Sequence, residues 1–283
     1  GTRLGEVDAT ILESEEVGGH SWFPIHITPA LIERLSGEDL AIPDLRAPID
    51  LAIAERAAGL FPPLGDSAGW HARFGRELNA SDDRDILHPQ GRGLPVLEGK
   101  HIDPFRVRTG AVRWFADPRD LERRLGRRHL RARLAYRDVA SSTNRLTLIA
   151  AMLPARCAST HTVFCLKTPL PLTGQYLLCG LFNSFVLNYL VRLRVTTHVT
   201  TAIVERLPVP RRQDGPSACQ DIARLARELQ RAPSRHALAR LNAVVARLYR
   251  LSADEFAHVL ATLPLVAADT RAEALRAFAD AAR

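Results

Sequence analysis

An acidic cluster followed by a Glu-x-Lys triplet is the most enzyme-like pattern in this chain. Asp82, Asp83 and Asp85 precede a triplet made of Glu98, a glycine and Lys100. In many divalent-metal nucleases, carboxylates in this order bind Mg²⁺ while the lysine helps to activate a water molecule. The glycine inside the triplet favours a turn over a central strand, so a Mg²⁺-dependent nuclease that uses Glu98 and Lys100 stands only as an alternative.

Arginine is the second residue type that indicates chemistry. The chain has 283 residues and a net charge of +7, and 36 of its 38 basic residues are arginines. Residues 106–145 hold twelve arginines against four acidic residues, a net charge of +8, so the rest of the chain carries −1. A planar guanidinium suits phosphate oxygens, which predicts a nucleic-acid surface; an acidic protein partner and a solvated basic face are the alternatives. A smaller basic group follows, made of Arg192, Arg194, Arg206, Arg211 and Arg212.

Several signatures of catalysis and cofactor binding do not occur in the sequence. There is no glycine-rich dinucleotide fingerprint, no P-loop and no H-E-x-x-H pair, and the ten histidines are scattered. We therefore expect no catalytic and no metal-binding residues. The cysteines form no C-x-x-C pair, which predicts free, buried thiols in a reducing compartment. They are Cys157, Cys165, Cys179 and Cys219.

The apolar pattern argues against a membrane partner. No run of eighteen apolar residues occurs, and the longest candidate, residues 177–191, is interrupted by two asparagines and a serine. Residues 1–20 are acidic and contain no apolar leader, so we expect a cytoplasmic protein. The chain begins with Gly1 and its only methionine is Met152, so we expect it to be a piece of a longer parent.

Hydrophobic periodicity predicts an α+β fold, with strands in the middle of the chain and helices in its C-terminal part. Alternation with period two predicts strands at 134–137 and 146–153 and a hairpin formed by 105–108 and 111–114. We also expect strands at 94–97, which is short and apolar, at 162–166 and at 201–207. Helical spacing predicts helices at 28–37, 48–58 and 120–128, and a long amphipathic helix at 175–193. Capping boxes that begin at Ser217, Ser252 and Thr270 predict helix starts in the C-terminal stretch.

A succession of sequence blocks carries a resemblance to a known family. The blocks are FGRELNASDDR at 74–84, LPVLEGKHI at 94–102, YRDVASSTNR at 136–145, LFNSFVLNYLVR at 181–192, VERLPVP at 204–210 and LNAVVARLYRLS at 241–252. In this order they resemble the C-terminal specificity region of adenine-specific DNA methyltransferases of the type IIG restriction–modification class. They are also similar to the TaqI-like specificity domain. The resemblance covers residues 61–263, and the preceding residues match none of its blocks.

The resemblance implies a division of the chain and a function. It implies a partly helical connecting segment at 1–60, a strand-rich DNA target-recognition lobe at 61–210 and a helical module at 211–283. The methyltransferase half of the family has a glycine-rich loop for S-adenosylmethionine and an N-P-P-[YF] tetrapeptide that holds the flipped adenine, and neither occurs here. We therefore expect this chain to read duplex DNA without modifying it.

Cofactors and partners follow from the same resemblance. The chain itself is expected to need no cofactor, while its parent uses S-adenosylmethionine, and Mg²⁺ if it also cleaves. Its partners are expected to be duplex DNA and the N-terminal methyltransferase or nuclease part of the same parent. The family has its E-G-K triplet in the specificity region, which weakens the nuclease alternative. The C-terminal helices could instead dock the catalytic half, which would make them a protein-interaction module.

The candidate site residues fall into two classes. The expected phosphate contacts are basic residues of the arginine-rich segment and its flank: Lys100, Arg106, Arg108, Arg113, Arg123, Arg124, Arg127 and Arg128. The base-reading candidates are Arg137, Asn144 and Arg145, because arginine can bind guanine with two hydrogen bonds and asparagine can bind adenine. The alternative for them is structural, with Arg137 paired to Asp138 and Asn144 placed in a turn.

Two polar residues inside the predicted helix 175–193 are expected to have a structural role. Asn183 and Ser184 interrupt an otherwise apolar sequence. A buried polar group is costly unless it is hydrogen-bonded. We therefore expect both side chains to satisfy a neighbouring loop.

Overall fold

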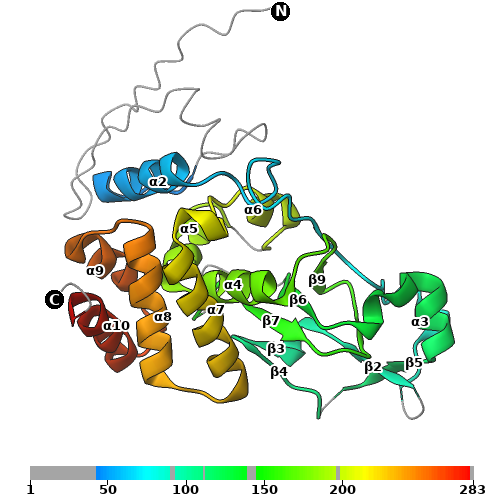
Figure 1. Cartoon of the computed structure of the whole chain (residues 1–283). Coiled ribbons are helices and arrows are strands. Elements are labelled where there is room, and N and C mark those ends of the chain that lie inside the picture. Colours follow the sequence, from blue (N-terminus) through cyan, green and yellow to red (C-terminus); the bar gives the residue numbers. More distant parts are fainter. Residues whose placement is uncertain (1–42, 90–92, 111, 139–144, 196–197, 281–283) are drawn as a thin grey trace, which may run out of the picture.

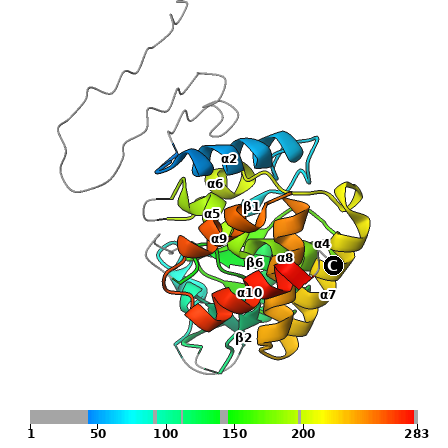
Figure 2. The same ribbon diagram turned by 90° about the vertical axis from the view of Figure 1, so that its left-hand side faces the viewer.

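The computed structural model describes residues 43–89, 93–110, 112–138, 145–195 and 198–280. Over these residues the chain has the expected α+β fold, with sheets in the middle of the sequence and helices around and after them (Figure 1). Figure 2 shows the C-terminal helices lying side by side. No helix in these ranges is long and apolar enough to cross a bilayer. The helix predicted at 28–37 lies outside them.

The largest sheet has four antiparallel strands. Their order is β1 (Phe74–Gly75), β9 (Val163–Leu166), β6 (Arg133–Arg137) and β7 (Ala150–Leu153). The helix α4 (Leu172–Phe182) packs on β6 and β7. The strands β7 and β9 are buried throughout, so their sequences are apolar runs rather than clean alternations. The strands predicted at 134–137 and 162–166 are confirmed, and the one predicted at 146–153 is confined to its second half.

The smaller sheets contradict the predicted hairpin. One has the order β5 (Trp114–Ala116), β2 (Leu94–Leu97) and β8 (Ala158–Ser159), and the other pairs β3 (Ile102–Asp103) with β4 (Arg106–Val107). The two halves of the predicted hairpin therefore join different sheets. The cause lies at Phe105, which turns the chain with a positive φ of 67°. Its side chain is buried, and its amide donates to the carbonyl of Ala150 at 2.9 Å.

The long helix predicted at 175–193 is wrong as a single element. It is divided into α4 and α5 (Phe185–Arg192) by Asn183 and Ser184. The amide of Asn183 accepts from the backbone N–H of Ala150 at 3.1 Å and donates to its carbonyl at 2.8 Å. Ser184 caps α5 by accepting from the N–H of Leu187 at 3.3 Å. A structural role for these two residues is confirmed, but their partners are a strand, β7, and the start of α5 rather than a neighbouring loop.

The other helices depart from prediction mainly at their ends. The predicted strand at 201–207 is wrong, because Thr200 caps a short helix, α6 (Thr201–Glu205). Of the three predicted capping boxes, only the one at Ser252 lies at the start of its helix. The remaining helices are α2 (Pro48–Leu60), α3 (Pro118–Leu125), α7 (Pro216–Arg231), α8 (Arg235–Leu248), α9 (Ala253–Ala261) and α10 (Ala268–Asp280).

One hydrophobic core connects the sheet with the C-terminal helices. The helix α7 packs directly on α4, and α8 packs on α7 and α10. Gly180 of α4 permits this close approach, because a Cβ at this position would lie 2.6 Å from the side chain of Ile222 on α7. The same buried cluster extends from Ile53 on α2 to Phe278 on α10.

A buried ion pair links the largest sheet to the three-stranded one. The guanidinium of Arg133 on β6 donates two hydrogen bonds of 2.6 Å to the carboxylate of Glu77, and these side chains are only 7% and 2% exposed. Ser159 of β8 donates to Glu77 through both its N–H and its hydroxyl at 3.0 Å. Arg133 also donates to the carbonyl of Cys157 at 3.0 Å. Both charges are therefore surrounded by hydrogen-bonding partners.

We expect Glu77→Gln to lower the free energy of unfolding by about 3–5 kcal/mol, because the charge of Arg133 would stay buried without its counter-charge. Urea denaturation followed by circular dichroism measures this loss. The double variant Glu77→Gln with Arg133→Met removes both charges and should recover part of the stability. A single variant within about 1 kcal/mol of the wild type would contradict the expectation.

A second buried carboxylate joins three helices. Asp50 of α2 is 4% exposed and accepts from the hydroxyl of Tyr189 on α5 at 2.6 Å. Its Oδ1 also lies 2.7 Å from Nε2 of His258 on α9, and its Oδ2 accepts from the N–H groups of Arg46 and Ala47 at 2.8 and 2.9 Å. Burial alone would raise the pKa of Asp50, but these hydrogen bonds outweigh it and hold the pKa below its ordinary value of 3.8.

Asp50→Asn should lower the free energy of unfolding at pH 7 by about 2–3 kcal/mol, because it removes charge-assisted hydrogen bonds. Since the folded-state pKa is depressed, the stabilisation is present above pH 3.8 and is lost as the pH falls through the folded pKa. The difference between wild type and variant should therefore shrink below pH 3.8. Chemical denaturation over pH 2–7 tests this. Asp44→Asn, at an exposed ion pair, is the matched control, and a difference independent of pH would contradict the expectation.

Candidate nucleic-acid interface

The helix α3 presents part of the arginine-rich segment. Asp117 caps it by accepting from the N–H of Arg119 at 2.8 Å, and a proline occupies its first position. Leu121 is buried and fixes the inner face of the helix. Gly126, with a positive φ of 60°, ends it, so the basic helix predicted at 120–128 stops at Leu125. The residues after it form a 3₁₀ turn, Gly126–Leu130, and not a continuation of the same face.

The exposed arginines of α3 and its following turn differ in how they are neutralised. Arg123 pairs with Asp120 on the same helix. Arg124 pairs with Asp83 at 3.0 Å and with Asp85 at 3.4 Å. Three others are exposed and form no ion pair with an acidic residue in the described part of the chain. These are Arg119, Arg127 and Arg128.

A second basic area lies around the β3–β4 pair. Arg106 is exposed on β4 opposite Asp103. Arg108 pairs with Asp103 at 2.8 Å and donates to the carbonyl of Lys100 at 2.5 Å. Lys100 lies 2.7 Å from the carboxylate of Glu98. The predicted phosphate contacts here are thus grouped together, but two of them are partly neutralised by carboxylates.

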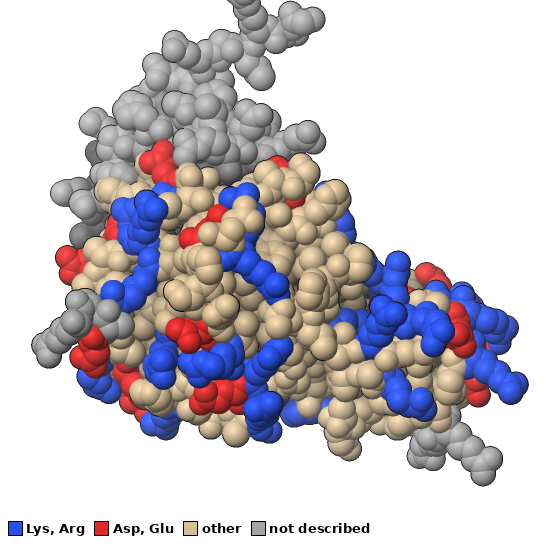
Figure 3. Space-filling view, viewed as in Figure 1, with Lys and Arg blue, Asp and Glu red and all other residues tan. Residues whose placement is uncertain are grey.

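Arg113, the remaining predicted phosphate contact, lies at the start of β5. It is exposed, and its guanidinium lies 4.7 Å from the ring centre of Trp114. This distance is typical of a cation–π contact, which orients the guanidinium without neutralising it. Figure 3 shows that basic side chains predominate over the lobe that carries α3, whereas the two signs alternate over α7.

The three base-reading candidates have different surroundings. Arg137 ends β6 half-buried, and its Nε has no hydrogen-bond partner among the residues described. Burial lowers the pKa of Arg137. The predicted ion pair with Asp138 is absent, because Asp138 instead pairs with Arg76 at 3.3 Å and with His198 at 3.5 Å.

The other two candidates are not brought to the same place by any described contact. Asn144 lies outside the described residues. Arg145 is exposed, and its carbonyl accepts from the guanidinium of Arg192 at 3.4 Å. Arg137 is instead next to the E-G-K triplet, since its Cβ lies 3.5 Å from the point that a Cβ would occupy if Gly99 had a side chain. It therefore belongs to the basic area around β3 and β4.

The smaller basic group has mainly structural contacts. Arg192 donates to the carbonyl of Thr262 at 2.6 Å. Arg194 donates to the carbonyl of Arg206 at 3.2 Å, and burial lowers the pKa of Arg194 to about 10. Arg211 pairs with a carboxylate three residues along the chain at 2.9 Å. These three side chains are therefore occupied within the fold.

The residues of the nuclease alternative are occupied by cations. Glu98 pairs with Lys100, while Asp83 and Asp85 pair with Arg124. Among the residues that the structure describes, no three His, Cys, Asp or Glu side chains come together in a group that could hold a metal ion. The arrangement therefore adds no support to metal-dependent chemistry at this triplet.

A serine-hydrolase pattern, G-x-S-x-G, occurs at residues 65–69. A nucleophile elbow of this kind sits between a strand and a helix, with a histidine beside the serine. Here the segment is a series of turns, and the hydroxyl of Ser67 donates to the neighbouring carboxylate of Asp66 at 3.3 Å. The amide of Ala68 donates to the same carboxylate at 2.8 Å. The segment is therefore built as a polar turn.

The four cysteines are free and buried, as predicted. Burial raises the pKa of Cys165 and Cys179 to about 12, and that of Cys157 and Cys219 to about 11. A thiol with such a pKa is protonated at neutral pH and is a poor nucleophile. These side chains act as core residues.

The structure adds residues that the sequence reasoning did not select. Arg76 and His198 both approach Asp138, which brings together segments far apart in the sequence. Arg76 also lies with its guanidinium 5.2 Å from the ring centre of Phe164. Arg119 and Arg131 add exposed positive charge near α3. Only the density of arginine in 106–145 could have indicated the last two, and no local pattern indicated Arg76.

Comparison with known proteins gives no family for this chain. No model of a known protein family matches it, and no curated protein sequence matches it either.

Proposed function

We propose that this protein recognises specific sequences in double-stranded DNA as the target-recognition part of an adenine-specific DNA methyltransferase of a restriction–modification system. The observation that carries the proposal is the set of exposed arginines on α3 and its following turn that lack acidic partners among the described residues: Arg119, Arg127 and Arg128. Phosphate contacts of this kind position a protein on DNA, while contacts to base edges provide specificity. The resemblance of the sequence blocks supplies the class of parent enzyme.

The proposal assigns separate roles to the chain and its parent. This chain binds DNA and has no catalytic role of its own. The N-terminal part of the parent supplies methyl transfer from S-adenosylmethionine, and Mg²⁺ serves a parent that also cleaves. Binding takes place in the cytoplasm, where the duplex is the partner.

Binding should weaken steeply with salt. If about five phosphates are neutralised, log K should fall against log [salt] with a slope of roughly −4 to −5. We expect Arg127→Ala with Arg128→Ala to weaken binding to all duplexes about equally and to reduce the slope by about one for each lost contact. Fluorescence anisotropy over a range of NaCl concentrations measures both quantities.

The matched control is Arg240→Ala with Arg276→Ala, which removes the same net charge. Both residues are exposed, on α8 and α10. This control should leave affinity and slope close to those of wild type. Micromolar binding that does not depend on salt would contradict the role of the arginine-rich segment. Failure of the wild type to bind any duplex would refute the proposed function itself.

Arg137→Ala should lower the free energy that separates specific from non-specific binding by about 1–3 kcal/mol, the value of one bidentate base contact. Because Arg137 makes no ion pair with Asp138, the melting temperature of the Arg137→Ala variant should stay close to that of wild type. Titration with cognate and scrambled duplexes, run beside a thermal melt, measures both. A lowered melting temperature with an unchanged ratio would show that Arg137 is scaffold.

A further inference from the structure

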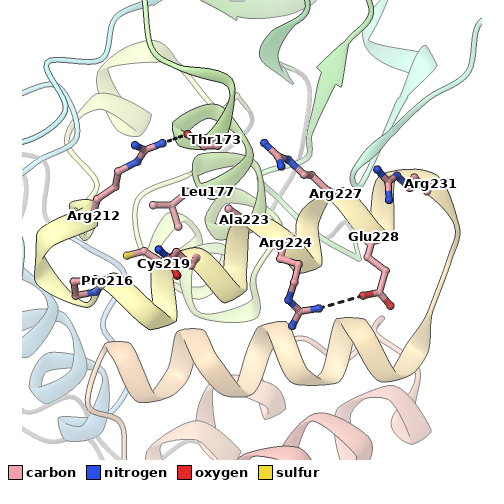
Figure 4. Close-up of a pocket in the computed structure, with 11 residues that line it drawn as sticks. Thr173, Leu177, Arg212, Pro216, Cys219, Ala223, Arg224, Arg227, Glu228 and Arg231 are labelled. Atoms are coloured by element: carbon pink, nitrogen blue, oxygen red, sulfur yellow. Dashed lines mark hydrogen bonds and ion pairs between the residues drawn. The ribbon is translucent and has the colours of Figure 1, made fainter.

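A groove with several arginines runs along α7 and the first turns of α4. Its volume is about 630 Å³. Figure 4 shows the arginines spread along α7 and the turn before it, with smaller side chains between them. The smaller side chains include Leu177, Cys219 and Ala223. Of the basic residues singled out in the sequence, only Arg212 lines this groove.

Most of the positive charge in the groove is not cancelled by nearby acids. Arg227 lies with its guanidinium 4.7 Å from the ring centre of Tyr176. Arg212 donates to the hydroxyl of Thr173, a neutral partner. Arg231 is exposed, and none of these three arginines pairs with a carboxylate in the part of the chain that the structure describes.

The charge of the fourth arginine in the groove, Arg224, is neutralised by nearby carboxylates. Arg224 lies 3.2 Å from the carboxylate of Asp221 and 3.7 Å from that of Glu228. Figure 4 shows Arg224 and Glu228 directed toward one side of α7, and Arg227 and Arg231 toward the other. The acids therefore neutralise one edge of the helix and leave the other edge positive.

The positive edge borders the basic area described above. The helix α7 contacts β4, which carries the exposed Arg106 (Figure 1). Arg227 and Arg231 are one helical turn apart, about 6 Å along the helix axis, so each can reach a different phosphate of one strand. Stacking on Tyr176 holds the guanidinium of Arg227 in place while its N–H donors stay available.

We propose that this groove binds the sugar–phosphate backbone of duplex DNA that extends beyond the recognition surface. The inference rests on the proposed function and adds a second contact to it, made by the C-terminal helices. Guanidinium groups bind phosphate oxygens with their planar fork, and every bound phosphate releases counter-ions. The groove is therefore independent of sequence and adds affinity rather than discrimination.

The test compares two pairs of substitutions that remove the same charge. Arg227→Gln with Arg231→Gln changes the groove, and Arg240→Gln with Arg276→Gln changes exposed arginines on α8 and α10. The probe is a mixed-sequence duplex of about 30 base pairs, titrated at several NaCl concentrations. Each lost phosphate contact lowers the salt slope by about 0.9 and the affinity at 0.1 M salt by roughly tenfold. The groove pair should therefore weaken binding by about ten- to a hundred-fold, and the control pair should not.

A further variant separates charge from folding. Arg227→Lys with Arg231→Lys keeps both charges and should retain most of the wild-type affinity. If the groove Gln pair and the control Gln pair both melt like wild type and the groove pair binds duplex as tightly as the control pair, the inference is overturned. If the Gln pair loses binding to poly-glutamate but not to the duplex, the groove binds acidic protein and the inference is likewise overturned.

The same measurements distinguish failure of the inference from failure of the proposed function. If the function is wrong, the wild type and every variant fail to bind duplex DNA. If only the inference is wrong, wild type binds with a steep salt slope, Arg127→Ala with Arg128→Ala weakens it, and the groove variants do not. Weakening by the groove pair alone, with the control pair unchanged, supports the second contact.

Discussion

The buried pair between Glu77 and Arg133 is the interaction on which the arrangement of the sheets depends. It places a carboxylate and a guanidinium where water cannot solvate them. Two hydrogen bonds of 2.6 Å join the two groups, and the carbonyl of Cys157 and the hydroxyl of Ser159 supply further partners. Neither charge can remain there alone. Arg133 belongs to β6 and the Ser159 contact to β8, so the pair fixes the four-stranded sheet relative to the three-stranded one.

The elements that could be predicted from the sequence are those formed by local periodicity, and the elements that could not be predicted depend on contacts between distant residues. Periodicity predicted the apolar strands and most helices, because burial imposes it locally. It did not predict the division between α4 and α5, where Asn183 satisfies the edge of β7. It also missed the turn at Phe105, which follows from contact with Ala150. Both depend on partners distant in the sequence, which periodicity does not contain.

The candidate interface was predictable to a similar degree. The density of arginine located the basic segment, since charge is a property of composition. Which arginines keep their charge available was not predictable, because Arg124 is neutralised by Asp83 and Asp138 is paired with Arg76 rather than with its neighbour Arg137. The groove on α7 was missed because its arginines become neighbours of β4 only after folding. Sequence therefore indicates where positive charge is concentrated sooner than it indicates which side chains keep that charge available.

The close packing of Gly180 against Ile222 has a consequence for dividing this chain into fragments. Because α4 and α7 pack closely at Gly180, residues 208–215, which precede α7, do not act as a flexible linker. Cutting the chain there and removing α7 would expose the apolar faces of both helices. A fragment that contains the four-stranded sheet and α4 would have to include α7 in order to keep the apolar face of α4 covered.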